Sequence, residues 1–157
     1  MTFRLFSSLL AGGSLLLSTP AQAQTGPAAS ATPTPARQLV TVVVSALAST
    51  QATVKLYFYN KPGQFLKKGQ YVFSRFVKPE GKREIALPVD LPKGEWAVVI
   101  TQDINNNDRL DKNFLGIPTE PYAFSNNVRP TLAPPQFDDC KFMVSEPGKV
   151  VSIVLKK

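Results

Sequence analysis

The chain has 157 residues, of which 43% are hydrophobic and 18% are charged, with a formal net charge of +7 at pH 7. It contains no histidine and one cysteine, which excludes histidine-dependent catalytic triads, the commonest zinc ligand and an intrachain disulfide. The basic residues are scattered without interleaved aromatic side chains, which argues against a nucleic-acid-binding protein.

Residues 1–23 have the features of a secretory signal peptide. Arg4 is the only charge ahead of an apolar stretch from Leu5 to Leu17, and a small-x-small pattern, Ala-Gln-Ala, closes the segment. An uncleaved anchor helix is the alternative, but the apolar run is short for a bilayer. We therefore expect cleavage after Ala23, export to the periplasm or the cell exterior, and no transmembrane segment in the mature chain.

A change of composition separates this segment from the rest of the chain. Residues 24–37 are rich in alanine, proline and threonine and carry one charge, which predicts a flexible linker. Residues 38–157 are then left as one domain of ordinary size.

Apolar residues alternate with period two throughout residues 38–157, and no helical apolar stripe occurs there. The alternating runs lie at 39–48, 52–59, 71–77, 84–89, 95–102, 139–144 and 151–155. Paired proline and glycine residues separate several of them and are typical of turns. About seven short strands predict an all-β, single-domain antiparallel β-sandwich of immunoglobulin-like or transthyretin-like type. A small β-barrel is the alternative.

Two of the runs predict which side chains are buried. In the first, one face carries Val40, Val42, Val44 and Ala46. In the late run, Cys140 alternates in step with Phe142 and Val144, so we expect an inert core thiol on a strand.

A long irregular segment, rich in proline and asparagine, is expected at residues 103–135. It opens with oxygen-bearing side chains at alternate positions, namely Asp103, Asn105, Asn107 and Asp111, with the carbonyl of Arg109 between them. This spacing follows an EF-hand-type loop and makes these residues candidate ligands of a weak Ca²⁺ site. The glycine and bidentate glutamate of such loops are replaced by Asp108 and Phe114. A turn stitched by side chains that accept backbone amides is the alternative, and the sequence leaves both open.

Further along, Glu120 is a candidate late ligand, and Tyr122 and Phe124 add apolar bulk to the irregular segment. The two aromatic residues either pin the segment onto the sandwich or form a binding surface together with Glu120. A structural module should bury Tyr122 and Phe124, whereas a binding module should expose them in a concave patch.

The order of four segments, GEWAVVITQD, DINNNDRLD, FLGIPTEPYAFSNN and PPQFDDCKF, resembles the exported bacterial proteins grouped as Domain of Unknown Function 2141. The matching positions are Gly94, Trp96, Asp103, Asn105, Asn107, Leu110, Asp111, Gly116, Pro118, Glu120, Ser125, Asn126, Pro135 and Phe137. Gln102, Ala123 and Cys140 depart from the family pattern, and Gln102 stands where the family often has histidine. The resemblance implies an exported β-sandwich and supplies no activity.

These features together predict a non-catalytic binding or accessory module of the cell envelope that meets an unidentified envelope or extracellular partner. The first alternative is a structural envelope protein in which the loop only closes the sandwich. An enzyme built on carboxylates such as Asp138, Asp139 or Glu120 is the least favoured class, because nothing aims these groups at a common site.

Overall fold

The computed structural model describes residues 36–116, 118–131 and 133–155. The expected signal peptide lies outside the described residues, and so does the expected linker apart from its last two residues. The elements in this described part are β1 (Arg37–Ser45), β2 (Thr53–Tyr59), the 3-10 turn η1 (Pro62–Gln64), β3 (Phe73–Val77), β4 (Ile85–Pro92), β5 (Gly94–Asp103), β6 (Tyr122–Phe124), the 3-10 turn η2 (Ser125–Asn127), α1 (Phe137–Cys140), β7 (Phe142–Val144) and β8 (Lys149–Val154). None of the described helices is long and apolar enough to cross a bilayer.

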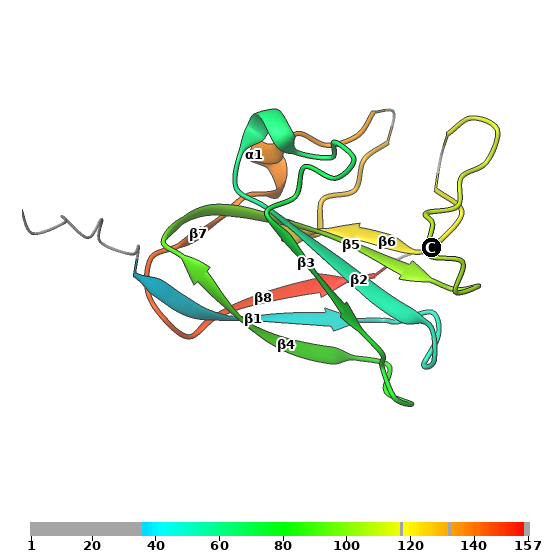
Figure 1. Cartoon of the computed structure of the whole chain (residues 1–157), viewed down its shortest axis with the longest axis horizontal. Coiled ribbons are helices and arrows are strands. Elements are labelled where there is room, and N and C mark those ends of the chain that lie inside the picture. The colour runs from blue at the N-terminus through cyan, green and yellow to red at the C-terminus, as the bar shows by residue number, and fades with distance from the viewer. Residues whose placement is uncertain (1–35, 117, 132, 156–157) are drawn as a thin grey trace, which may run out of the picture. The chain divides into compact units, whose positions relative to one another are not determined.

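The strands form two sheets that pack face to face (Figure 1). The smaller sheet has the order β4-β1-β8, and the larger has the order β3-β2-β5-β6, with β7 also paired to β5. The sheets do not close into a barrel, so the all-β sandwich prediction is confirmed. One pair differs from the expected antiparallel pattern: β8 runs parallel to β1, because the chain reaches β8 by crossing from the larger sheet through β7.

The main core lies between the sheets and follows from the alternation. The inner faces contribute Val40, Val42, Val44, Val54, Leu56, Phe58, Trp96, Val98, Ile100, Val151 and Ile153. Each fully buried aliphatic side chain of this kind contributes about 1.5–3 kcal/mol to the free energy of unfolding. The period-two pattern therefore predicts which side chains of each strand lie between the two sheets.

The first run departs from its predicted face at its end. Strand β1 stops at Ser45, and Ala46 is exposed with a left-handed φ of 56°. This backbone conformation reverses the alternation, so Leu47, at 1% exposure, takes the buried place expected for Ala46. The prediction for Ala46 is wrong for that reason.

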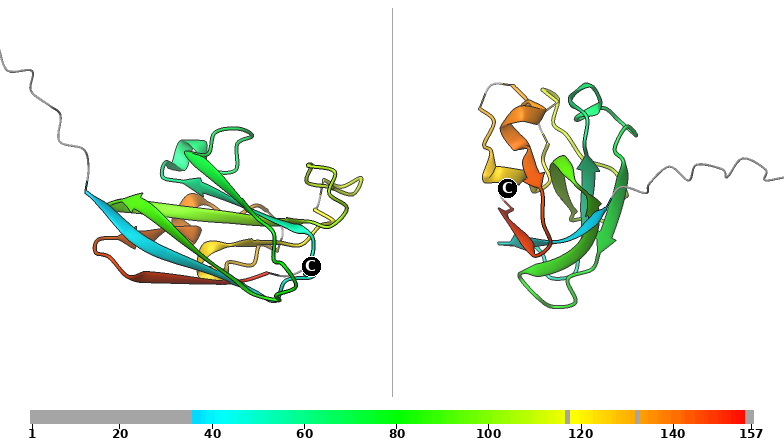
Figure 2. Two further views of the ribbon diagram at one scale, coloured as in Figure 1. Left: turned by 60° about the horizontal axis from the view of Figure 1, so that its bottom comes forward. Right: turned by 90° about the vertical axis from the view of Figure 1, so that its left-hand side faces the viewer.

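The larger sheet is covered on its outer face as well. A second buried cluster contains Tyr59, Phe65, Ala97, Val99, Phe124, Phe137 and Cys140. Phe65, directly after η1, meets Phe137 of α1 with ring centroids 5.8 Å apart. Figures 1 and 2 show η1 and α1 on the side of the larger sheet that faces away from β1, β4 and β8. Strand β5 is therefore buried on both faces, which accounts for its almost uninterrupted apolar run.

Cys140 belongs to this second cluster. Its burial is confirmed, at 0% exposure, but its place on a strand beside Phe142 is wrong. The Asp139 carboxylate accepts a 2.8 Å hydrogen bond from the backbone amide of Gln136 and closes the single helical turn α1, which Cys140 ends. Phe142 reaches the main core only after this turn.

Candidate functional site

The polar loop after β5 is built around the carboxylate of Asp103. This group is 1% exposed, and its Oδ2 lies 2.7 Å from Nζ of Lys55 on the neighbouring strand β2. Its two oxygens also accept backbone N–H groups from Asn107 at 3.1 Å and Asp108 at 2.9 Å. One buried side chain thus ties the end of a core strand to the loop that follows it.

Lys55 carries the opposite charge of this pair and is 5% exposed. Its ammonium group donates a second hydrogen bond, at 2.9 Å, to Oδ1 of Asp108, whose side chain is 91% exposed. The Nζ atom also lies 5.7 Å from the ring centroid of Phe76. The loop therefore covers a positive charge that belongs to the protein, the ammonium group of Lys55.

Both buried charges have shifted pKa values. Burial by itself raises the pKa of Asp103, but the hydrogen bonds from Lys55, Asp108 and Asn107 bring it below its usual 3.8. Burial by itself lowers the pKa of Lys55, but the hydrogen bonds to Asp103 and Asp108 raise it above its usual 10.5. The pair is therefore ionised throughout the neutral pH range.

The rest of the loop is held by its own side chains. Oδ1 of Asn105 accepts the amide of Asn107 at 3.2 Å, and Oδ1 of Asn107 accepts the amide of Arg109 at 2.8 Å. The Asp111 carboxylate accepts the side-chain amides of Asn105 at 2.7 Å and of Asn107 at 3.0 Å. The structure thus brings the five predicted metal ligands into one loop, and their contacts are those of the stitched turn.

Two further observations bear on the calcium site. Asn106 and Asp108 have left-handed φ values of 54° and 60°, and Asp108 stands where an EF-hand-type loop would carry glycine. Within the residues that the structure describes, no group of three His, Cys, Asp or Glu side chains is placed to hold a metal ion. Calcium binding by this loop stays a prediction.

Glu120 anchors the base of the loop. It is 6% exposed, Oε1 accepts the amide of Ile104 at 2.9 Å, and Oε2 lies 3.4 Å from the amide nitrogen of Asp111. Its carboxylate is drawn inward by these amides and does not join Tyr122 and Phe124 in a surface.

Tyr122 and Phe124 lie on β6, a short strand inside the segment that was expected to be irregular. The pairing of β6 with β5 sets Phe124 opposite Val99 and Tyr122 opposite Thr101, on the outer face of the larger sheet. Phe124 is buried and Tyr122 is half-buried. Phe124 is therefore buried, as expected for a structural module, whereas Tyr122 stays in partial contact with solvent.

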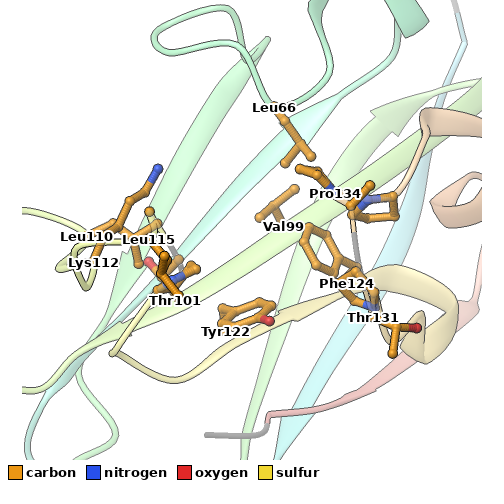
Figure 3. A pocket seen from close by; sticks show the side chains of 15 residues that line it. Leu66, Val99, Thr101, Leu110, Lys112, Leu115, Tyr122, Phe124, Thr131 and Pro134 are labelled. Carbon is orange, nitrogen blue, oxygen red and sulfur yellow. The ribbon is translucent and has the colours of Figure 1, made fainter.

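These residues form the floor of a hollow of about 520 Å³ (Figure 3). The hollow is lined by Leu66, Val99, Thr101, Leu110, Lys112, Leu115, Gly116, Pro118, Tyr122, Phe124, Pro130, Thr131, Ala133, Pro134 and Pro135. Figure 3 shows Leu110, Lys112 and Leu115 at one end and Thr131 and Pro134 at the other. The lining is mostly apolar, and Lys112 is its single charged residue among those described.

Two polar residues with a structural role were missed by the sequence analysis. Gln102 is fully buried, and its side-chain oxygen accepts the amides of Ala48 and Ser49, while its nitrogen donates to the carbonyls of Ser49 and Ala52. It therefore holds the connection between β1 and β2. The signal in the sequence was Gln102 itself, a polar residue in the alternating inner-face series that includes Val98 and Ile100.

Ser125 is the second missed residue. Its hydroxyl accepts the amide of Val98 at 2.9 Å and donates to the carbonyl of Cys140 at 2.5 Å. The neighbouring Asn126 side chain donates to the carbonyls of Asp139 and Lys141. This Ser-Asn pair, which belongs to the resemblance described above, joins β5, η2 and α1.

Comparison with known proteins places the chain in a family. Residues 42–152 match a family model described as "Uncharacterized protein conserved in bacteria (DUF2141)". Neither a curated protein nor a solved structure matches the chain. The matched range includes the Asp103 loop, both missed residues and every lining residue of the hollow.

Proposed function

The chain belongs to the DUF2141 family of uncharacterised bacterial proteins, and from its geometry we propose a non-catalytic binding or accessory module that is exported to the cell envelope. In this proposal the ligand binds in the hollow on the outer face of the larger sheet. The Asp103 loop closes one end of the sandwich and supports one end of the hollow.

The observation that carries the proposal is the hollow itself. Its volume of about 520 Å³ falls within the range of roughly 300–1,000 Å³ typical of small-molecule sites. Its lining combines apolar side chains with the hydroxyls of Thr101, Tyr122 and Thr131, a mixture that such sites use to hold and orient a ligand.

The chemistry of the reactive groups supports a role without catalysis. The chain has no histidine, and burial, followed by the charge of Asp139, raises the pKa of Cys140 to about 12, so its thiolate is scarce at neutral pH. Asp138 pairs with Lys141 at 2.9 Å, and the Glu120 carboxylate accepts backbone amides. The carboxylates considered for an enzyme are therefore already engaged.

Two other roles give different outcomes in the same experiments. In a structural envelope protein the hollow would have no ligand, and we would expect no probe to bind to its apolar walls. A weak calcium site in the Asp103 loop would be a second activity of the same module, supported by the alternating oxygens and opposed by the position of Lys55.

The binding role can be tested with a neutral apolar dye, N-phenyl-1-naphthylamine, whose fluorescence rises in apolar sites. We expect saturable binding that Leu115→Asp weakens, because Leu115 lines the hollow and is 67% exposed. Leu39→Asp is the matched control, since Leu39 is 48% exposed on the smaller sheet. Equal loss in both variants, or no saturable binding at all, would contradict the proposal.

Export rests on the signal-peptide pattern of residues 1–23. The intact mass of the protein recovered from the exported fraction should correspond to a chain that begins at Gln24. Protein retained in the cytoplasm with Met1 in place would refute this part of the proposal.

A further inference from the structure

We propose that the hollow takes an anionic amphiphile with a single acyl chain, in the manner of a long-chain fatty acid. This inference rests on the proposed binding function of the hollow and adds the chemical class of its ligand. The acyl chain would lie along the floor formed by β5 and β6, and the anionic head would lie at the lysine end.

The apolar part of the ligand is indicated by the continuity of the lining. Tyr122 and Phe124 form an aromatic floor with ring centroids 5.8 Å apart. The walls stay apolar where they reach solvent, because Leu66 and Leu115 are exposed by 37% and 67% and still line the hollow. An extended hydrocarbon chain would cover these exposed side chains along with the floor, and burial of apolar surface favours binding.

The charge of the ligand is indicated by the lysines. Lys112 lines one end of the hollow, and Lys67 and Lys68 follow directly after the wall residue Leu66. None of the three makes an ion pair within the described part of the chain, and no described lining residue is acidic. The hollow therefore offers positive charge with no carboxylate of its own to meet it.

The acidic residues of the neighbouring loop have hydrogen-bonding partners of their own. Asp103 and Asp108 both pair with Lys55, and Asp111 accepts the side-chain amides of two asparagines. None of these carboxylates pairs with Lys112 within the described part of the chain. Lys112 is left as a partner for a carboxylate or a phosphate on the ligand.

The test measures displacement of the neutral dye from the whole protein by dodecanoate and by dodecanol, which share a chain length and differ in charge. We expect dodecanoate to displace the dye at a lower concentration. Lys112→Glu should weaken dodecanoate by about fivefold and leave dodecanol unchanged, as expected for an exposed ion pair. Lys93→Glu is the control, because Lys93 is exposed in the turn at the far end of β5.

A second variant, Lys67→Glu with Lys68→Glu, changes the two lysines that follow the wall residue Leu66 and should weaken dodecanoate less than Lys112→Glu does. If the two probes displaced the dye equally and no lysine variant changed this, the proposal that the ligand is anionic would be overturned. The binding of the dye would still support the proposed function. The acyl-chain ligand would be overturned if neither probe displaced the bound dye. It would also be overturned if the protein bound anionic lipid vesicles and did not bind monomeric dodecanoate. Absence of dye binding would overturn both proposals.

Discussion

The Asp103 loop and the hollow adjoin each other and differ in what their side chains contact. In the loop, the oxygens of Asp103, Asn105, Asn107 and Asp111 accept hydrogen bonds from the loop itself or from Lys55. In the hollow, Leu66, Leu110 and Leu115 contact solvent as well as the protein. The loop, which is the most conspicuous motif of the sequence, is thus satisfied by the fold, whereas the hollow has a surface that a ligand can still cover.

The largest effect should come from removing the buried carboxylate of the loop. Asp103→Ala leaves the ammonium of Lys55 buried beside one exposed partner and removes an acceptor from two amides. We expect the free energy of unfolding to fall by about 3 kcal/mol in urea titrations. Asp108→Asn removes the charge of the 91% exposed partner of the same lysine, keeps a residue that tolerates the left-handed φ of 60°, and should cost under about 1 kcal/mol. Equal costs would show that the loop is not built on Asp103.

The same pair predicts a dependence on pH. The folded-state pKa of Asp103 lies below 3.8, so its charge stabilises the fold above that value and the contribution disappears as the pH falls through the folded-state pKa. The difference in unfolding free energy between the wild type and Asp103→Asn should therefore be constant near neutral pH and shrink in acid. A difference that stays constant down to pH 2 would contradict the assignment.

A smaller effect on stability is expected in the hollow. Leu115→Ala removes a side chain that is 67% exposed and should change the unfolding free energy by under about 0.5 kcal/mol. The same change should weaken binding of the neutral dye. A large loss of stability would show instead that Leu115 pins the loop onto the sandwich, and the contrast between the two regions would no longer hold.

Calcium should also have a small effect. Because Lys55 already lies against Asp103, we expect millimolar calcium to raise the melting temperature by a few degrees at most, equivalent to under about 1 kcal/mol. Melts in calcium and in chelator measure this difference. A larger rise that Asp111→Ala abolishes would establish a calcium site and would place a ligand in both regions.

Several features of the protein were predictable because they depend on local spacing. Val40, Val42 and Val44 lie two residues apart on one strand, so their common face follows from backbone geometry alone. The alternating run at 151–155 follows the same geometry, and its Val151 and Ile153 are both buried. This reasoning failed at Ala46, whose left-handed φ reverses the alternation although no glycine or proline marks the position.

The sequence by itself therefore determined the sandwich, its main core and the crowding of polar residues into one loop, because each follows from the spacing of neighbouring residues. Only the tertiary structure decided that Lys55 meets Asp103, that Gln102 holds the turn before β2, and that Tyr122 lies beside Leu115 and Pro134 in one hollow. These contacts join residues far apart in the chain. They arise when strands pair and loops fold over a sheet, and no local periodicity records which distant side chains will then come together.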